Sequence, residues 1–511
     1  METEPDKNSY GAVLKSSTII GAASLLNVGL AILRTKVIAL LLGPTGIGLF
    51  GLYATITDLT RSFAGMGIQS SSVRQIAESV GTGDHQRIAC TVTALRRIAL
   101  LTGALGALLL LVFSKQTSQL TFGDDHHSHA ISLLAWAVLF GDISAAQGAL
   151  IQGMRRIPDL AKMNVLGAIY GTVFSIPIIY VYGEQGVAPS LVCVAAMGIL
   201  TSWWYARKIK ITHTPIAWRP LIRESANLLT LGIVLMAAGL FVLGSAYLTR
   251  TLILRLLSVE AAGFYQAAWA LSGIYVGFIL QAMSADFYPR LTAAAHDHFT
   301  CNRLVNEQAT VGLLLAGPGL LTTLTFAPVI IELFYSARFE PAVEILRWNC
   351  LGMLLQVGSW PMGFIILAKG ESWIYFWTEL GSSLFYVGMV CFCVHTFGLT
   401  GAGVAFFALY AAHWIVVYAI ARQLTDFRWS AINKQTGLLF GCLISLFFVA
   451  GYFLRHRNLL IVGAPILLIV WFKSLKKLCA LVPGEQLSRP VLHLLTRLRL
   501  INLGASPILH K

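Results

Sequence analysis

The chain has 511 residues, of which 56% are hydrophobic and only 12% are charged, with a formal net charge of +14. Soluble globular domains carry about 25% charged residues, so this composition excludes a string of soluble domains, a disordered regulator and a secreted disulfide scaffold. Many apolar runs approach or exceed the ~20 residues of a spanning helix, and they lack the alternation of barrel strands. The composition therefore indicates a polytopic, helical membrane protein.

The apolar runs predict an all-α fold with about fourteen transmembrane helices. The second predicted helix is the weakest span, because it contains Asp58 and Arg61. In chain order, the predicted helices cover residues 17–42, 46–68, 93–114, 129–153, 161–182, 186–206, 226–253, 259–288, 309–335, 343–368, 373–397, 400–421, 436–454 and 458–475.

The distribution of Lys and Arg predicts the topology. If both termini are cytoplasmic, 27 of the 37 basic residues lie in inside segments, six lie in outside segments, and four lie within helices. This asymmetry is the one expected from the positive-inside rule. It also explains the basic composition without nucleic acid as a partner.

An internal repeat is visible at a constant offset along the chain. Residues 43–51 align with 258–266, Gly148 aligns with Gly363, and the Gly183/Gly186 pair aligns with Gly398/Gly401. Because each repeat holds six helices, both copies insert with the same orientation, as in transporters built from parallel repeats. We therefore predict two six-helix lobes in a parallel pseudo-twofold repeat (1–215 and 216–430), two additional helices (431–475) and a basic cytoplasmic tail (476–511).

Charged side chains within the predicted spans are the candidate binding residues, since intramembrane charge is costly and usually functional. Arg34 and Lys36 lie on the first helix, where Arg34 shares a face with Asn27 seven residues earlier. Arg61 lies on the second helix. A cleft lined by such cations favours an anionic substrate, and the guanidinium fork suits phosphate.

Three further charges admit two interpretations each. Asp58 precedes Arg61 by three residues, so the two either neutralise each other or Asp58 tunes Arg61 and couples transport to an ion. Arg250 and Arg255, near the outer end of the seventh helix, either extend to the lipid headgroups or add cations to the cleft. By the repeat offset, Arg250 matches Thr35, which Arg34 and Lys36 flank.

No metal, cofactor or catalytic site is predicted. The eight cysteines are scattered without paired CxxC motifs, and there is no GxxxxGK[ST] sequence for ATP. The run Asp124-Asp125-His126-His127-Ser128-His129 is interpreted as a solvated external loop.

Eight short segments together resemble bacterial O-antigen flippases. They follow the same order as in that family and span most of residues 15–430. The segments are Leu42–Phe50, Asp286–Leu291, Asn302–Gln308, Leu333–Ser336, Phe339–Ala342, Ile345–Trp348, Trp360–Pro361 and Leu367–Gly370.

The resemblance implies the polysaccharide-transporter branch of the multidrug/oligosaccharidyl-lipid/polysaccharide exporter superfamily. It implies a flippase that moves undecaprenyl-pyrophosphate-linked oligosaccharide, an O-antigen or related repeat unit, from the cytoplasmic to the periplasmic leaflet of the bacterial inner membrane by alternating access. Membrane lipids, a counter-moving H⁺ or Na⁺, and other polysaccharide-assembly proteins are the implied partners.

Related lipid II flippases also imply roles for particular residues, because basic residues on their helices 1, 2 and 8 line the cavity. Arg34 and Lys36 match the helix 1 role and Arg61 the helix 2 role. The eighth predicted helix has no mid-helix Arg, and Arg250 and Arg255 are the candidate substitutes. Asp58 is the candidate ion-coupling residue.

Two other functions remain open. An ion-coupled multidrug antiporter of the same superfamily requires intramembrane acids, whereas bases predominate here. A membrane-embedded polysaccharide-assembly enzyme requires catalytic residues in a large external loop, and the longest predicted external loop, 115–128, is short.

Overall fold

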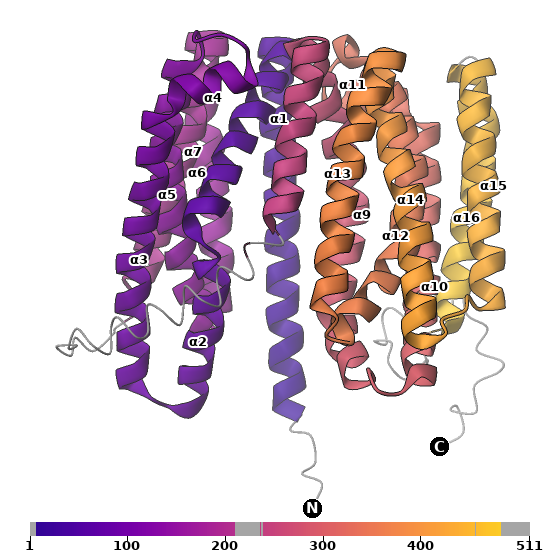
Figure 1. Cartoon of the computed structure of the whole chain (residues 1–511), viewed down its shortest axis with the longest axis horizontal. Helices are drawn as coiled ribbons and strands as arrows, with labels where there is room; N and C mark the ends of the chain where they lie inside the picture. Colours follow the sequence, from indigo (N-terminus) through magenta and orange to yellow (C-terminus); the bar gives the residue numbers. More distant parts are fainter. Residues whose placement is uncertain (1–6, 210–235, 237–238, 455, 482–511) are drawn as a thin grey trace, which may run out of the picture. The chain divides into compact units, whose positions relative to one another are not determined.

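The computed structural model describes residues 7–209, 236, 239–454 and 456–481, and every regular element in these ranges is a helix (Figure 1). The chain forms two compact units. The first comprises Met1–Gln266 with Phe334–Phe339, and the second comprises Ala267–Leu333 with Glu340–Lys511. The lobe boundary predicted at residue 215 lies outside the described residues and stays a prediction, as does the tail beyond residue 481.

The first unit is a bundle in which α3 and α7 pack on α5, and α6 packs on α7 and α1. Its buried side chains form two apolar clusters, one around Tyr53 and Leu134 and the other around Leu95 and Leu150. Its elements are α1 (Lys7–Gly65), α2 (Ile68–Thr82), α3 (His85–Val112), α4 (Ser114–Thr121), α5 (Ser128–Gly153), α6 (Ile157–Tyr182), η1 (Gly183–Gly186), α7 (Val187–Ala206), the helix Gly239–Leu256, the start of α9 (Val259–Ala293) and η2 (Ala337–Phe339).

The second unit contains the remaining helices. In it, α12 packs on α10 and α14, and α13 packs on α14. Its elements are the rest of α9, α10 (His298–Thr325), α11 (Ala327–Phe334), α12 (Ala342–Ala368), α13 (Ser372–Phe397), η3 (Gly398–Thr400), α14 (Gly401–Thr425), α15 (Ala431–Phe453) and α16 (His456–Leu481).

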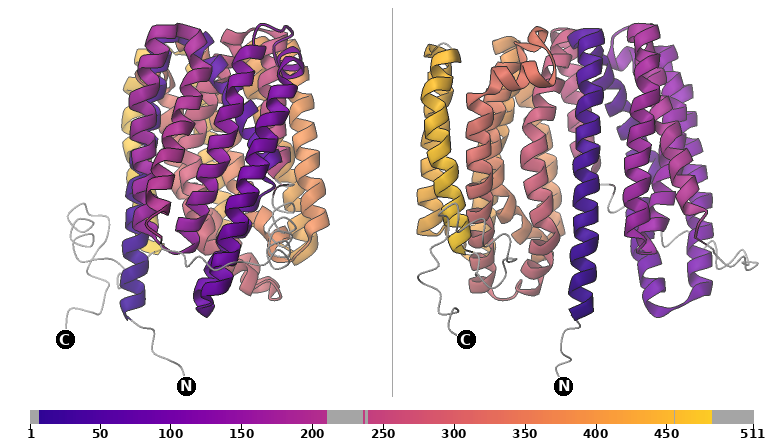
Figure 2. Two further views of the ribbon diagram at one scale, coloured as in Figure 1. Left: turned by 90° about the vertical axis from the view of Figure 1, so that its left-hand side faces the viewer. Right: turned by 180° about the vertical axis from the view of Figure 1, so that it is seen from behind.

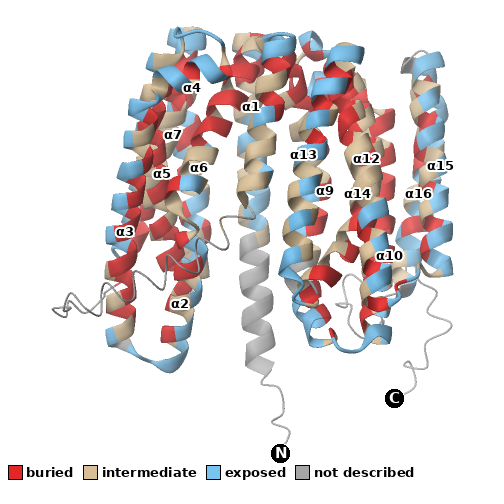
Figure 3. Cartoon of the chain, viewed as in Figure 1, coloured by how far each residue is buried: buried red, intermediate tan, exposed pale blue. Residues whose placement is uncertain are grey.

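The surfaces of both units are those of a multi-pass membrane protein. Exposed residues run along the helices (Figure 3), and many are large and apolar, such as Leu101 at 69% and Tyr180 at 74% exposure. Exposing apolar faces of this extent to water is unfavourable, whereas contact with lipid chains is not. Among the described helices, ten are long and apolar enough to span a membrane, or eleven if α10 and α11, which are bent by 80°, form one broken span.

Glycines divide the longest helical stretches. Gly43 interrupts α1 with φ 67° and ψ −161°, between two predicted helices. Three of the ten candidate spans are 45, 50 and 54 residues long and contain such a break, so the predicted number of fourteen helices stays a prediction. Positive φ favours glycine, which has no Cβ to clash with the backbone.

The helix bounds support the internal repeat. Helices α6 and α13 have the same length, 26 residues, and both ends of α13 match those of α6 at the repeat offset. Each ends at a glycine of nearly identical conformation, Gly183 with φ 58° and ψ −135° and Gly398 with φ 61° and ψ −140°, and a 3-10 turn follows each. The two copies therefore share local backbone geometry as well as spacing.

Two glycines at the repeat offset also allow the backbones of α1 and α9 to meet. A Cβ on Gly48 would overlap the Val259 carbonyl, and a Cβ on Gly263 would overlap the Pro44 carbonyl. Only glycine fits at both positions.

Two short helices are absent from the sequence prediction. Helix α2 ends at Gly83, which has φ 70°, and buries Ile68 and Ile76. Helix α3 then begins eight residues earlier than predicted, because the Asp84 carboxylate accepts a hydrogen bond from the Arg87 backbone N–H at 2.8 Å and caps it. Helix α4 follows α3 directly.

The last two helices pack firmly on α10 (Figure 2). Asn433 of α15 accepts a hydrogen bond from Thr310 at 2.7 Å and donates one to the Asn306 carbonyl at 2.8 Å. The ring of Phe440 covers Gly317, where a Cβ would lie 2.6 Å from it. Helices α15 and α16 are thus an integral part of the second unit.

The loop before α5 is ordered against α1. The Tyr53 hydroxyl and His127 Nδ1 are hydrogen-bonded at 2.9 Å, and the His127 ring stacks on Phe122 at 3.8 Å. Burial lowers the pKa of His127 below its ordinary value of 6.5, although Asp124 opposes this effect. The neutral imidazole therefore fits this environment.

We expect acid to weaken this contact. The unfolded chain takes up a proton near pH 6.5 and the folded chain only at lower pH, so the stabilising contribution is complete above pH 6.5 and declines as the pH falls toward the folded pKa. The unfolding temperature of the purified protein should fall between about pH 7.5 and 5.5, and His127→Gln should reduce this drop. The exposed His129 is the control, and His129→Gln having the same effect would contradict the assignment.

Candidate functional site

The centre of the first unit contains an ion pair between α1 and α5. Arg61 Nε lies 3.2 Å from Asp142 Oδ1, and Arg61 Nη2 donates a hydrogen bond to the Gly141 carbonyl at 3.0 Å. Gly141 makes room for this arrangement, since a Cβ there would lie 2.6 Å from Arg61 Nε. The ion pair of Arg61 is therefore with Asp142 on another helix, and Asp58 on its own helix interacts with Arg61 only through its charge.

This ion pair lies deep within the bundle. At 1.5 Å per residue, Asp142 is about 21 Å from the start of α5 and about 16 Å from its end. Its side chain is 9% exposed, and its second oxygen, Oδ2, is buried without a hydrogen-bond partner. A buried carboxylate with one unsatisfied oxygen is costly, and such groups are typical of functional sites in membranes.

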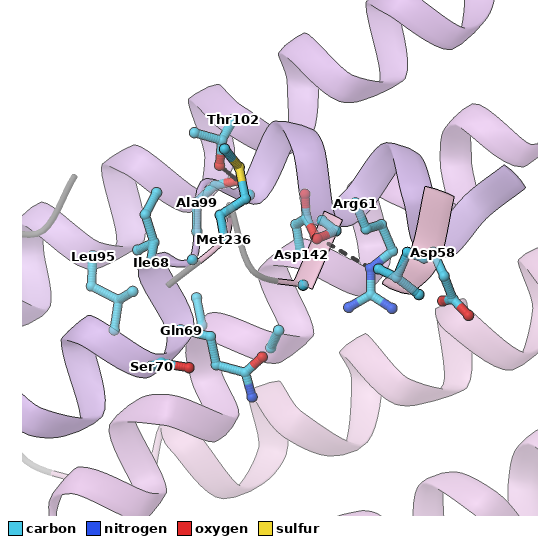
Figure 4. Close-up of a pocket in the computed structure, with 17 residues that line it drawn as sticks. Asp58, Arg61, Ile68, Gln69, Ser70, Leu95, Ala99, Thr102, Asp142 and Met236 are labelled. Atoms are coloured by element: carbon cyan, nitrogen blue, oxygen red, sulfur yellow. Dashed lines mark hydrogen bonds and ion pairs between the residues drawn. The ribbon is translucent and has the colours of Figure 1, made fainter. Parts of the chain in front are cut away.

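Asp58 is exposed and lies on the opposite side of Arg61 from Asp142 (Figure 4). Both Asp58 and Arg61 line two cavities. The first has a volume of about 390 Å³ and is bounded by α1, α2, α3 and α5, together with Met236, Gly239 and Leu243. The second has a volume of about 500 Å³ and is bounded by α1, α2, α5, α6 and α7.

Arg250 is buried next to this cluster. Its Nε donates to Gln266 Oε1 at 2.9 Å, its Nη1 donates to the Ala246 carbonyl at 3.0 Å, and its guanidinium lies 5.7 Å from the Tyr265 ring centroid. Arg250 and Arg61 both interact electrostatically with Asp58. The headgroup-directed orientation of Arg250 is therefore wrong, since its side chain points to protein groups.

Asn27 and Arg34 lie in the first half of α1, before Arg61, and each has a polar atom without a hydrogen-bond partner. Arg34 Nε and Asn27 Oδ1 are both buried without a hydrogen-bond partner. The Arg34 guanidinium lies 5.6 Å from the Phe50 ring centroid. Lys36, two residues later, is half-buried.

Arg255 lies apart from the other cations. It is exposed, and its Nη2 donates to the Gln119 carbonyl in α4 at 2.9 Å. Arg255 lines neither cavity, so its predicted role in substrate binding stays a prediction.

The structure thus brings together Asp58, Arg61, Arg250 and a residue absent from the sequence prediction, Asp142. These four residues, two arginines and two aspartates, form the charged cluster of the first unit. Among the described residues, no group of three or more His, Cys, Asp or Glu side chains is placed to hold a metal ion.

Comparison with known families decides the affiliation. The family described as polysaccharide biosynthesis protein matches residues 13–294, which is more than half of the chain. The chain belongs to this polysaccharide biosynthesis family.

Two curated relatives of this chain are named as flippases. The chain is 22% identical over 410 residues to the lipid III flippase of Escherichia coli (strain K12), and the alignment covers 79% of this chain and 96% of the relative. It is 20% identical to the probable low-salt glycan biosynthesis flippase Agl15 of Haloferax volcanii, covering 84% and 89%.

Two solved structures have the same fold as this chain. The lipid II flippase MurJ in an inward closed conformation aligns with a TM-score of 0.67 and 13% identity, covering 90% of this chain and all of MurJ. An inward-facing multidrug resistance MATE family transporter of the MOP superfamily aligns with a TM-score of 0.68 and 14% identity, covering 79% and 95%. The predicted all-α membrane-protein fold is confirmed, and at this identity the two structures show the fold alone.

Asp142 is the residue that sequence reasoning missed. It is the one acidic residue within α5, between apolar and small residues. A carboxylate in the middle of an apolar span is as costly as the guanidinium of Arg34, so the sequence alone marks Asp142 as a candidate functional residue. Its partner, 81 positions earlier, could not be inferred from local spacing.

Proposed function

We propose that this protein is a flippase for a lipid-linked oligosaccharide, and a transporter rather than an enzyme. The observation that carries the proposal is the Arg61 guanidinium, held deep in the bundle by Asp142 and open to two cavities. The family membership and the flippase names of relatives that match over 96% and 89% of their lengths support it.

The finer proposal concerns the substrate and its route. The substrate is an undecaprenyl-pyrophosphate-linked O-antigen or related repeat unit, moved from the cytoplasmic to the periplasmic leaflet of the bacterial inner membrane. The excess of Lys and Arg in the predicted inside segments supports cytoplasmic termini. Other polysaccharide-assembly proteins are the expected neighbours.

The mechanism follows from competition for guanidinium groups. A pyrophosphate head replaces Asp142 on Arg61, since phosphate accepts two parallel hydrogen bonds from arginine. Arg250, Arg34 and Lys36 add positive charge, and the unpartnered Asn27 carbonyl is available to a sugar hydroxyl. Alternating access then exposes the site to the other leaflet. A counter-moving H⁺ or Na⁺ couples at Asp58, which faces both cavities.

Reconstitution tests the proposed function. Proteoliposomes containing the full chain and a lipid-linked oligosaccharide in both leaflets are exposed to a membrane-impermeant glycosidase. Without transport, about half of the oligosaccharide is protected. With the chain and an ion gradient, we expect the protected fraction to change with time.

Protection that stays at the value of protein-free vesicles would refute the flippase proposal. The ion-coupled multidrug antiporter of the same superfamily is less supported, because its relatives share only the fold. Transport of a cationic dye by the same proteoliposomes, with no movement of oligosaccharide, would favour it.

A further inference from the structure

The second cavity of the first unit is lined by neutral polar side chains as well as by the charged residues Asp58 and Arg61. Four side chains contribute neutral polar groups to it: Gln69 of α2, Ser144 and Gln152 of α5, and Asn164 of α6. No hydrogen bond joins these four side chains to another residue in the described part of the chain. Gln69, Gln152 and Asn164 are exposed to the cavity.

The chemistry of these groups differs from that of the neighbouring cations. A primary amide both donates and accepts hydrogen bonds, as a hydroxyl does. A sugar ring presents the same mixture of donors and acceptors, whereas phosphate only accepts. Apart from Asp58 and Arg61 at its border, the cavity lining carries no formal charge. Amides and hydroxyls without charge favour a neutral carbohydrate over a second anion.

The size and the apolar part of the cavity lining also suit a sugar. Its volume of about 500 Å³ lies within the usual range of small-molecule sites. Apolar side chains of α6 and α7, including Met163, Leu191 and Val194, can contact the C–H faces of a ring. Gly198 leaves open space in α7, since a Cβ there would meet only Ser144 Oγ, at 3.6 Å.

We propose that this cavity is a carbohydrate subsite for the sugar attached directly to the pyrophosphate, with Asn164 and Gln152 as specificity-determining residues. The inference rests on the proposed function, because Arg61 belongs to the lining of this cavity and would hold the pyrophosphate at its border. The sugar that follows the phosphate then enters between α5, α6 and α7.

Binding of two lipids to the detergent-solubilised full chain tests this subsite. The probes are undecaprenyl pyrophosphate alone and undecaprenyl pyrophosphate carrying one N-acetylhexosamine, measured by microscale thermophoresis. We expect the wild-type chain to bind the sugar-bearing lipid roughly tenfold more tightly, as two or so neutral hydrogen bonds would provide. Asn164→Ala and Gln152→Ala should each remove roughly three- to tenfold of this preference and leave the bare lipid unaffected.

Two further variants make the test specific. Gly198→Leu fills the cavity at a helix position that favours leucine over glycine, so it should abolish the preference while the protein remains folded. Gln86→Ala removes an exposed amide of α3 that lies outside the cavity lining, and it should behave as wild type.

The outcomes separate the two proposals. Equal affinity of the wild-type chain for both lipids, or equal weakening of both lipids by Asn164→Ala, would overturn the carbohydrate subsite and leave the flippase proposal intact. Failure of the wild-type chain to bind either lipid would overturn the flippase proposal itself.

Discussion

Arg61→Glu should abolish transport of the lipid-linked oligosaccharide. The substitution replaces the guanidinium between Asp58 and Asp142 by a third carboxylate, which repels a pyrophosphate. Loss of charge-assisted hydrogen bonds to the headgroup costs about 1.5–3 kcal/mol, or roughly ten- to hundredfold in affinity, before the repulsion is added. Protection of the oligosaccharide in proteoliposomes measures the effect.

The same variant should also lower stability, because it leaves Asp142 buried without its partner. The expected cost is roughly 1–3 kcal/mol, since Arg61 is about one-third exposed and water screens part of the interaction. The thermal unfolding temperature and the elution profile of the purified protein therefore need to be measured beside transport.

Asp142→Asn separates binding from stability. An amide in place of the carboxylate keeps an acceptor near Arg61 Nε and removes the competing charge. Undecaprenyl pyrophosphate should then bind several-fold more tightly, while transport becomes slower because the head is released less readily. Weaker binding by this variant, or wild-type transport by Arg61→Glu, would contradict the exchange of partners at Arg61.

The course of the helices follows largely from the sequence, because glycine and apolar periodicity act locally. The interruption at Gly43 and the turns at Gly183 and Gly398 each require a backbone conformation that glycine adopts without strain. Helix α2 does not follow from the apolar pattern of the sequence, because it is rich in serine and only weakly apolar. Its start depends on Gly67, which adopts a left-handed conformation.

The charged cluster follows from the sequence only in part. Local spacing favours pairing of Arg61 with Asp58, three residues away, but Gly141 opens space on α5 and Arg61 extends there instead. Arg250 turns inward in a similar way toward Gln266, which is opposite Gly51. In both cases the partner of the arginine is set by close packing against a distant glycine, beside Arg61 itself at Gly141 and beside Gln266 at Gly51, and helical periodicity contains no information about such a contact.

Arg34→Glu should remove surface polysaccharide in a strain that depends on this protein, while the protein level stays normal. Arg34 forms no ion pair with another described residue, and its contact with Phe50 contributes only about 0.5–2 kcal/mol. Charge reversal therefore affects folding little, whereas it places a carboxylate where the pyrophosphate head is proposed to pass. Staining of surface polysaccharide and immunoblotting of the protein measure the two effects.

Arg74→Glu is the matched control for this experiment. Arg74 is exposed on α2 and lines neither cavity, so the same charge change there should leave surface polysaccharide normal. If Arg34→Glu restores surface polysaccharide as well as the wild-type chain does, the first half of α1 takes no part in holding the headgroup. If both variants abolish surface polysaccharide equally, transport depends on the net positive charge of the first unit and not on the position of Arg34. A site-specific interaction would instead distinguish the buried, unpartnered Arg34 Nε from the solvated guanidinium of Arg74.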